Sequence, residues 1–101
     1  MEARMVTLTP RPGHVDDVAA FWTGPVVAGL AAQPGNRGFV LLKDTANGRV
    51  IGLSLWDSAA DAEASGPTFR SHMEGIGQYL AEPPRAMIAE VAASTAGALT
   101  R

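Results

Sequence analysis

The sequence predicts an α+β domain in which a four-stranded antiparallel sheet carries two helices. The chain has 101 residues, a length that suits one domain. An Asn-Gly pair, Asn47-Gly48, lies between two apolar runs of strand length, which is typical of a β-hairpin. On either side of this hairpin, apolar residues recur at the spacing of an amphipathic helix. We therefore expect a single domain over residues 1–101 with a core at about residues 5–92.

The N-terminal third predicts a strand followed by a broken helix. The first strand, residues 5–8, ends at a loop with two prolines, which lack the N–H that a sheet ladder needs. The helix begins with the acidic pair Asp16-Asp17 in its first turn, where carboxylates stabilise the positive end of the helix dipole. Gly24-Pro25 then predicts a kink, followed by a second short helical segment that ends at about residue 33.

The central hairpin has an apolar strand on each side of its turn, at residues 39–43 and 50–56. Successive side chains of a strand point to opposite faces, so Leu41 and Leu42 lie on different faces of the sheet. Both faces are apolar in these two strands. An antiparallel sheet with helices on one face normally exposes polar side chains on the other. The sequence therefore predicts that something covers the second face.

The C-terminal half predicts a second helical region and a last strand. Ser58 suits a helix start, because its hydroxyl can accept a backbone N–H of the first turn, and Gly66-Pro67 breaks and restarts the helix. From there to about residue 81 an apolar stripe predicts one continuous helix, with Phe69, Met73, Ile76 and Leu80 on its buried face. Residues 85–91 form the last strand, and the tail at 93–101 is expected to be frayed.

This order of strands and helices predicts a ferredoxin-like βαββαβ fold. Burial of one large apolar side chain contributes about 1.5–3 kcal/mol, whereas a small domain is stable by only about 5–15 kcal/mol. An apolar sheet face left in water would forfeit much of that stability. We therefore expect a homodimer in which two such sheets pair face to face.

Composition excludes several functional classes. The net charge is −2 with scattered Lys and Arg, so nucleic acid is not an expected partner. The chain has no Cys and only two distant His, so neither a disulfide nor a metal site is expected. No glycine-rich phosphate loop follows a strand. We expect no signal peptide and no membrane segment, and hence a cytoplasmic protein.

Four short stretches carry a family resemblance: Arg11-Pro12-Gly13, Pro34-Gly35, the strand end Leu55-Trp56-Asp57-Ser58, and a later helix with His72. Across roughly residues 5–92 the chain resembles the antibiotic-biosynthesis-monooxygenase-like domains of the dimeric α/β barrel superfamily. The resemblance implies two sheets paired into a barrel and a small ligand between helices and sheet. Some members oxygenate aromatic polyketides without metal or flavin, so no cofactor is expected.

The haem-degrading branch of this superfamily uses an Asn on the first strand, a Trp on the helix after the third strand and a His on the later helix. Only the histidine has a counterpart in this chain, at His72. This departure argues against haem degradation.

His72 is the candidate catalytic residue. It flanks the apolar stripe of its predicted helix, and Tyr79 repeats its position seven residues later. An imidazole with a pKa near 6.5 could deprotonate a phenol or enol before the substrate meets oxygen. The alternative is a boundary histidine that packs its ring and hydrogen-bonds to solvent.

The candidate ligand-binding residues are Trp22, Phe69, Tyr79 and Arg37. Trp22 and Phe69 would form an aromatic wall, although inward aromatic residues are more often plain core. Arg37 could bind an anionic ligand at the pocket mouth, or could simply be a solvated loop residue.

Three functions stay open from the sequence. The first is a cofactor-independent monooxygenase of a small aromatic or polyketide-type substrate, which requires a cavity beside His72 and Tyr79. The second is a non-catalytic homodimer that binds a small molecule or acts in stress. The third is a structural dimer, in which Trp22 and Phe69 fill the interior.

Overall fold

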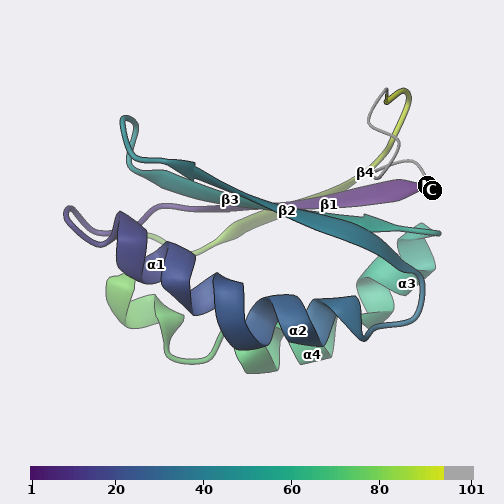
Figure 1. The fold of residues 1–101 in the computed structure, drawn as a ribbon, viewed down its shortest axis with the longest axis horizontal. Helices are drawn as coiled ribbons and strands as arrows, with labels where there is room; N and C mark the ends of the chain where they lie inside the picture. The colour runs from purple at the N-terminus through teal and green to yellow at the C-terminus, as the bar shows by residue number, and fades with distance from the viewer. Residues whose placement is uncertain (95–101) are drawn as a thin grey trace.

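Within residues 1–94, the helices lie on one face of the four-stranded sheet (Figure 1). The opposite face carries none of these helices, and we call it the bare face. The computed structural model describes residues 1–94, so residues 95–101 of the tail predicted to fray lie outside the described residues. In chain order, the elements are β1 (Glu2–Leu8), α1 (Val15–Phe21), the π-helix η1 (Trp22–Val26), α2 (Val27–Ala31), β2 (Asn36–Asp44), β3 (Arg49–Trp56), α3 (Ala59–Ala64), α4 (Gly66–His72), the 3-10 helix η2 (Ile76–Tyr79) and β4 (Arg85–Glu90).

The sheet has the order β2-β3-β1-β4, and every neighbouring pair is antiparallel. This is the ferredoxin-like α+β arrangement that the sequence predicts, and the prediction is confirmed. β1 begins three residues earlier than predicted, because Glu2, Ala3 and Arg4 continue the ladder opposite Trp56, Leu55 and Ser54.

The local signals of the hairpin and the helix starts are confirmed. The hairpin turns over residues 45–48, where Gly48 has a φ of +65° that glycine adopts without strain. Ser58 caps α3 by accepting a hydrogen bond of 3.1 Å from the Asp61 N–H. Gly24 interrupts the first helical region with φ −100° and ψ −108°, which produces the kink predicted at Gly24-Pro25.

The prediction of one continuous helix from residue 67 to residue 81 is wrong. α4 ends at His72, and Gly75 follows with a φ of +88°, which only glycine adopts readily. The chain then forms the separate short helix η2. As a result, His72 and Tyr79 do not repeat along one helix face.

The core lies between the helices and the sheet and contains both tryptophans. Its fully buried large side chains include Trp22, Trp56, Leu8 and Leu30. On the bare face, Met5, Leu42 and Met87 are 37%, 48% and 52% exposed, and they come from three different strands. The apolar second face predicted from the sequence is therefore present.

Candidate functional site

β1 places an arginine in the interior. Arg4, Val6 and Leu8 alternate along the strand and point to the helix side, where all three are buried. Arg4 is only 6% exposed although its side chain is charged. Burial lowers the pKa of its guanidinium, yet an arginine stays protonated at neutral pH. The interior therefore holds a permanent positive charge.

The guanidinium of Arg4 has one polar partner and two aromatic ones. Its Nη1 donates a hydrogen bond of 2.9 Å to the carbonyl oxygen of Ala62, near the C-terminal end of α3. Its Cζ lies 5.3 Å from the ring centroid of Trp56 and 5.0 Å from that of Phe69, within the range of a cation–π interaction. The Nε and Nη2 atoms are buried and have no hydrogen-bond partner.

Residues of β2 and β3 line the sheet side of the Arg4 guanidinium. In the sheet register, Phe39 of β2, Ser54 of β3 and Arg4 of β1 are cross-strand neighbours on the helix side. The Ser54 hydroxyl accepts a hydrogen bond of 2.9 Å from Trp56 Nε1, which fixes that indole ring beside the guanidinium. Ser54 and Trp56 are both buried.

Residues of the helical layer pack against these strand residues from the other side. Trp22 begins the kinked segment η1, and its ring stacks on Phe39 with centroids 5.3 Å apart. Phe69 of α4 meets the Trp22 ring edge to face at 5.4 Å. The Trp22 Nε1 is buried without a hydrogen-bond partner. We call the five residues Arg4, Trp22, Phe39, Trp56 and Phe69 the arginine–aromatic cluster.

The structure separates the predicted site residues into different places. His72 is half-buried and packs against Gly29 of α2, where any added Cβ would overlap the imidazole. Tyr79 lies at η2, with its ring 5.6 Å from that of His14. Only Trp22 and Phe69 are brought into contact with each other.

Arg37, the remaining predicted ligand-binding residue, lies at the surface. Its Nε donates to the Asp57 carboxylate, and both side chains are nearly half exposed. This ion pair joins the beginning of β2 to the residue after β3. The roles proposed for His72, Trp22, Phe69, Tyr79 and Arg37 stay predictions.

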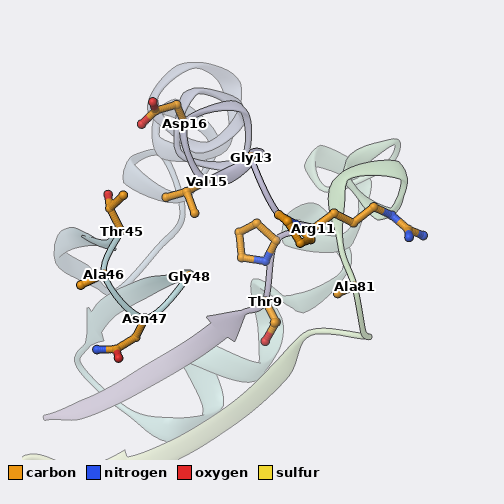
Figure 2. A pocket seen from close by; sticks show the side chains of 12 residues that line it. Thr9, Arg11, Gly13, Val15, Asp16, Thr45, Ala46, Asn47, Gly48 and Ala81 are labelled. Carbon is orange, nitrogen blue, oxygen red and sulfur yellow. The ribbon is translucent and has the colours of Figure 1, made fainter.

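A pocket of about 630 Å³ lies away from the cluster, between the β1–α1 loop and the β2–β3 turn (Figure 2). Val15 and Thr9 border it on one side, and Thr45 and Asn47 border it on the hairpin side. The side chain of Arg11 extends away from the hairpin, and its Nε donates to the Gln78 carbonyl oxygen at 3.3 Å. None of the residues labelled in Figure 2 directs a basic side chain into this pocket.

Within residues 1–94, no group of three or more His, Asp or Glu side chains could hold a metal ion. The helices in the same part of the chain are all too short or too polar to cross a membrane.

Arg4, the charged residue at the centre of the cluster, is not among the site residues predicted from the sequence. The signal was present in the alternation of Arg4, Val6 and Leu8, because a strand with Val6 and Leu8 inward must also turn Arg4 inward. The strand predicted from the sequence starts at Met5, so it places Arg4 in the segment before the sheet.

A ferredoxin-like domain with its helices on one sheet face and an aromatic interior beneath them defines the class of this protein. Within that class, the chain belongs to the antibiotic biosynthesis monooxygenase family, whose sequence profile matches residues 1–74. None of the curated protein sequences compared with the chain matches it.

Solved structures share the fold at low sequence identity. The ActVA-Orf6 monooxygenase of Streptomyces coelicolor, in complex with the ligand nanaomycin D, is 18% identical with a TM-score of 0.77, over 92% of this chain and 88% of that one. A protein of Mycobacterium tuberculosis is 17% identical with a TM-score of 0.76, over 93% and 97% of the two chains. A Nitrosomonas europaea protein of unknown function is 20% identical with a TM-score of 0.78, over 92% and 90%.

Proposed function

We propose that this protein is a cytoplasmic, cofactor-independent monooxygenase that acts as a homodimer on a small aromatic or polyketide-type substrate. Membership of the antibiotic biosynthesis monooxygenase family supports the reaction class. The arginine–aromatic cluster is the observation that carries the substrate class, because two rings, Trp56 and Phe69, lie beside one buried cation. The rings of Trp22 and Phe39 continue these aromatic contacts from Phe69, between the helices and the sheet. Such a lining suits a flat, apolar ligand with one polar end.

The chemistry needs a base and dioxygen but no redox group from the protein. Loss of a proton from a phenol or enol makes the neighbouring ring carbon electron-rich enough to react with O₂. A hydroperoxide then forms at a CH₂ carbon and loses water, which leaves a carbonyl there. One oxygen atom enters the product and the other leaves as water, so the substrate itself supplies both hydrogens and both electrons.

His72 is the base we propose for the proton transfer. It lies on α4 three residues after Phe69, the ring that covers the cluster. Its imidazole packs against Gly29 of α2, and a neutral imidazole has one ring nitrogen that can accept a proton.

Homodimer formation is supported by the bare sheet face. Met5, Leu42 and Met87 present large apolar side chains there, and Ile51 and Leu53 of β3 lie between them, half-buried. A contiguous apolar patch of this kind marks an interaction surface. A second copy would cover it with the same residues, as an isologous dimer requires.

The test is oxygen consumption with anthrone as substrate in buffer treated with a metal chelator. We expect one O₂ consumed per carbonyl formed, without accumulation of hydrogen peroxide. His72→Ala should lose most of this turnover. His14→Ala is the matched control, because His14 is exposed and pairs with Asp17 away from the cluster. Equal turnover in wild type and His72→Ala would remove His72 from the mechanism.

A structural homodimer with a filled interior is the second candidate, and the contact between Trp22 and Phe69 favours it. Their rings meet at 5.4 Å and occupy the space where a substrate would lie. A protein of this kind would bind aromatic compounds weakly or not at all and would leave anthrone unchanged. Absence of turnover by the wild-type dimer across anthrone-like phenols would favour this candidate.

A further inference from the structure

We propose that Arg4 is a carboxylate-binding residue, and that the ligand of the cluster is a planar aromatic carboxylic acid. This inference rests on the proposed function for the location of the site, and it adds the chemical class of the ligand. The Arg4 guanidinium has no counterion among the described residues.

No carboxylate pairs with Arg4 among the described residues. The ion pairs in residues 1–94 join His14, Arg37, Lys43, Arg49 and Arg85 to acidic residues, all at the surface. Arg4 is more deeply buried than any of these and has only the Ala62 carbonyl oxygen as a polar partner. Charged side chains are rarely buried without a partner, because removal of a charge from water is costly. A bound anion would supply the missing partner.

The two free donors of Arg4 have the geometry that a carboxylate requires. The N–H bonds of Nε and Nη2 lie side by side on one edge of the guanidinium and form a fork that matches two carboxylate oxygens. Ala62 occupies the other nitrogen, Nη1, and so leaves this edge free. A single phenol oxygen would satisfy one donor well, whereas a carboxylate satisfies both.

Aromatic rings next to the guanidinium select a flat ligand. Trp56 and Phe69 both lie within cation–π distance of Arg4, and Trp22 borders Phe69. Phe69 is the ring that a ligand would replace, because it is only partly buried and α4 contains no fully buried residue. An aromatic acid would restore the ring contact with Arg4 and add the two hydrogen bonds that Phe69 cannot make.

The buried indole N–H of Trp22 is consistent with the same ligand. Trp22 is 1% exposed, and its Nε1 has no hydrogen-bond partner in the folded chain. It lies two residues before Gly24, where the first helical region is kinked. A polar substituent on the ligand ring would satisfy this donor.

The test compares two probes of nearly equal shape, 2-naphthoate and 2-naphthamide, at neutral pH. Quenching of tryptophan fluorescence reports binding, since Trp22 and Trp56 both belong to the cluster. We expect the wild-type protein to bind 2-naphthoate about tenfold more tightly than 2-naphthamide, as a charge-assisted hydrogen bond implies. Arg4→Met should bind both probes equally.

Arg49→Met is the matched control, because Arg49 lies at the hairpin and pairs with Asp44 at the surface. It should keep the wild-type preference for 2-naphthoate. A preference that persists in Arg4→Met, or that disappears in Arg49→Met as well, would show general attraction to positive charge and would overturn the inference. The same conclusion follows if the wild-type protein binds both probes equally, or binds neither.

A measurement on the wild-type protein makes the test independent of how the variant folds. When the site is saturated, the Arg4 Nε–H resonance in ¹⁵N NMR should shift further with 2-naphthoate than with 2-naphthamide, because only the carboxylate accepts a charge-assisted hydrogen bond from it. Failure of this inference is separable from failure of the proposed function. Anthrone turnover without any role for Arg4 would overturn only the inference, and selective naphthoate binding without turnover would overturn only the oxygenase.

Discussion

Trp22 lies directly on the backbone of Gly52. A Cβ atom at Gly52 would come within 2.6 Å of the Trp22 ring carbons Cη2 and Cζ3. Gly52 is buried in β3, opposite Val6 of β1 and Leu41 of β2. The missing side chain on the sheet therefore makes the room in which the indole ring lies beside Phe39 and Phe69.

Gly52→Ala should destabilise the protein by about 1–3 kcal/mol, the usual cost of overpacking a filled core. The Trp22 ring is 1% exposed and contacts Phe39 and Phe69, so it has no free space into which to move. Urea unfolding followed by fluorescence measures the change. Gly77→Ala is the control, because a Cβ there has no atom within 4 Å and the residue lies in a helical turn. A stability for Gly52→Ala equal to that of Gly77→Ala would contradict the tight contact with Trp22.

The sequence predicts the strands and their order well because each carries a local signal. The Asn-Gly turn, the Ser58 cap and the Gly66-Pro67 break depend on residues that are adjacent in the chain, and all three appear in the structure. Gly75 was the exception. An apolar stripe ran through it unbroken, but its positive φ ends the helix that the stripe predicts.

The candidate site was less predictable, because its residues meet only through the tertiary fold. Trp22 and Phe69 were identified by their spacing, and they do face each other. The alternation along β1 places Arg4 on the helix side, but its partners Ala62, Trp56 and Phe69 are distant in the chain and meet it only through the tertiary fold. The separation of His72 from Tyr79 follows from the helix break at Gly75.

Leu42→Glu should dissociate the proposed homodimer. Leu42 points away from the helices, whereas Leu41 packs against the core, so the charge would lie on the bare sheet face. In a dimer this face is buried, and an unpaired buried charge is very costly. In a monomer the same side chain is 48% exposed and a charge there would be well tolerated. Sedimentation equilibrium at micromolar protein separates these cases, with Leu42→Met as the control that keeps the dimer. A folded wild-type monomer would refute the homodimer.

Acid should loosen the β2–β3 turn through Asp44. Hydrogen bonds from the side chain and the backbone of Asn47 lower the pKa of the Asp44 carboxyl below its ordinary value of 3.8. Because the ionised form is favoured in the folded state, its contribution to stability is present at neutral pH and is lost as the pH falls through the lowered pKa. Carbon-detected NMR titration should give a midpoint for Asp44 below that of the same residue in urea. Faster amide exchange at Asn47 should accompany protonation, and an unchanged midpoint would contradict the turn geometry.

Arg4→Met should leave the free protein as stable as wild type or make it more stable. The substitution removes one hydrogen bond to the Ala62 carbonyl oxygen and two cation–π contacts. It also removes a buried charge and two buried donors without partners, and replacement of buried ionic groups by apolar residues of similar volume is often neutral or stabilising. Arg4→Ala is the contrast, because it leaves a cavity and should cost about 2–5 kcal/mol, as truncation of other long core side chains does.

Ligand linkage then separates the two roles that Arg4 could have. A ligand at one hundred times its dissociation constant stabilises the folded state by about 2.7 kcal/mol. Saturating 2-naphthoate should therefore raise the unfolding temperature of the wild-type protein clearly and that of Arg4→Met hardly at all. If Arg4 were purely a structural residue, Arg4→Met would lose stability in the absence of any ligand and naphthoate would shift neither protein. The decisive result has two parts. 2-Naphthoate stabilises the wild-type protein, and Arg4→Met is more stable than wild type when no ligand is present. Together they would show that the chain retains this buried charge for binding rather than for folding.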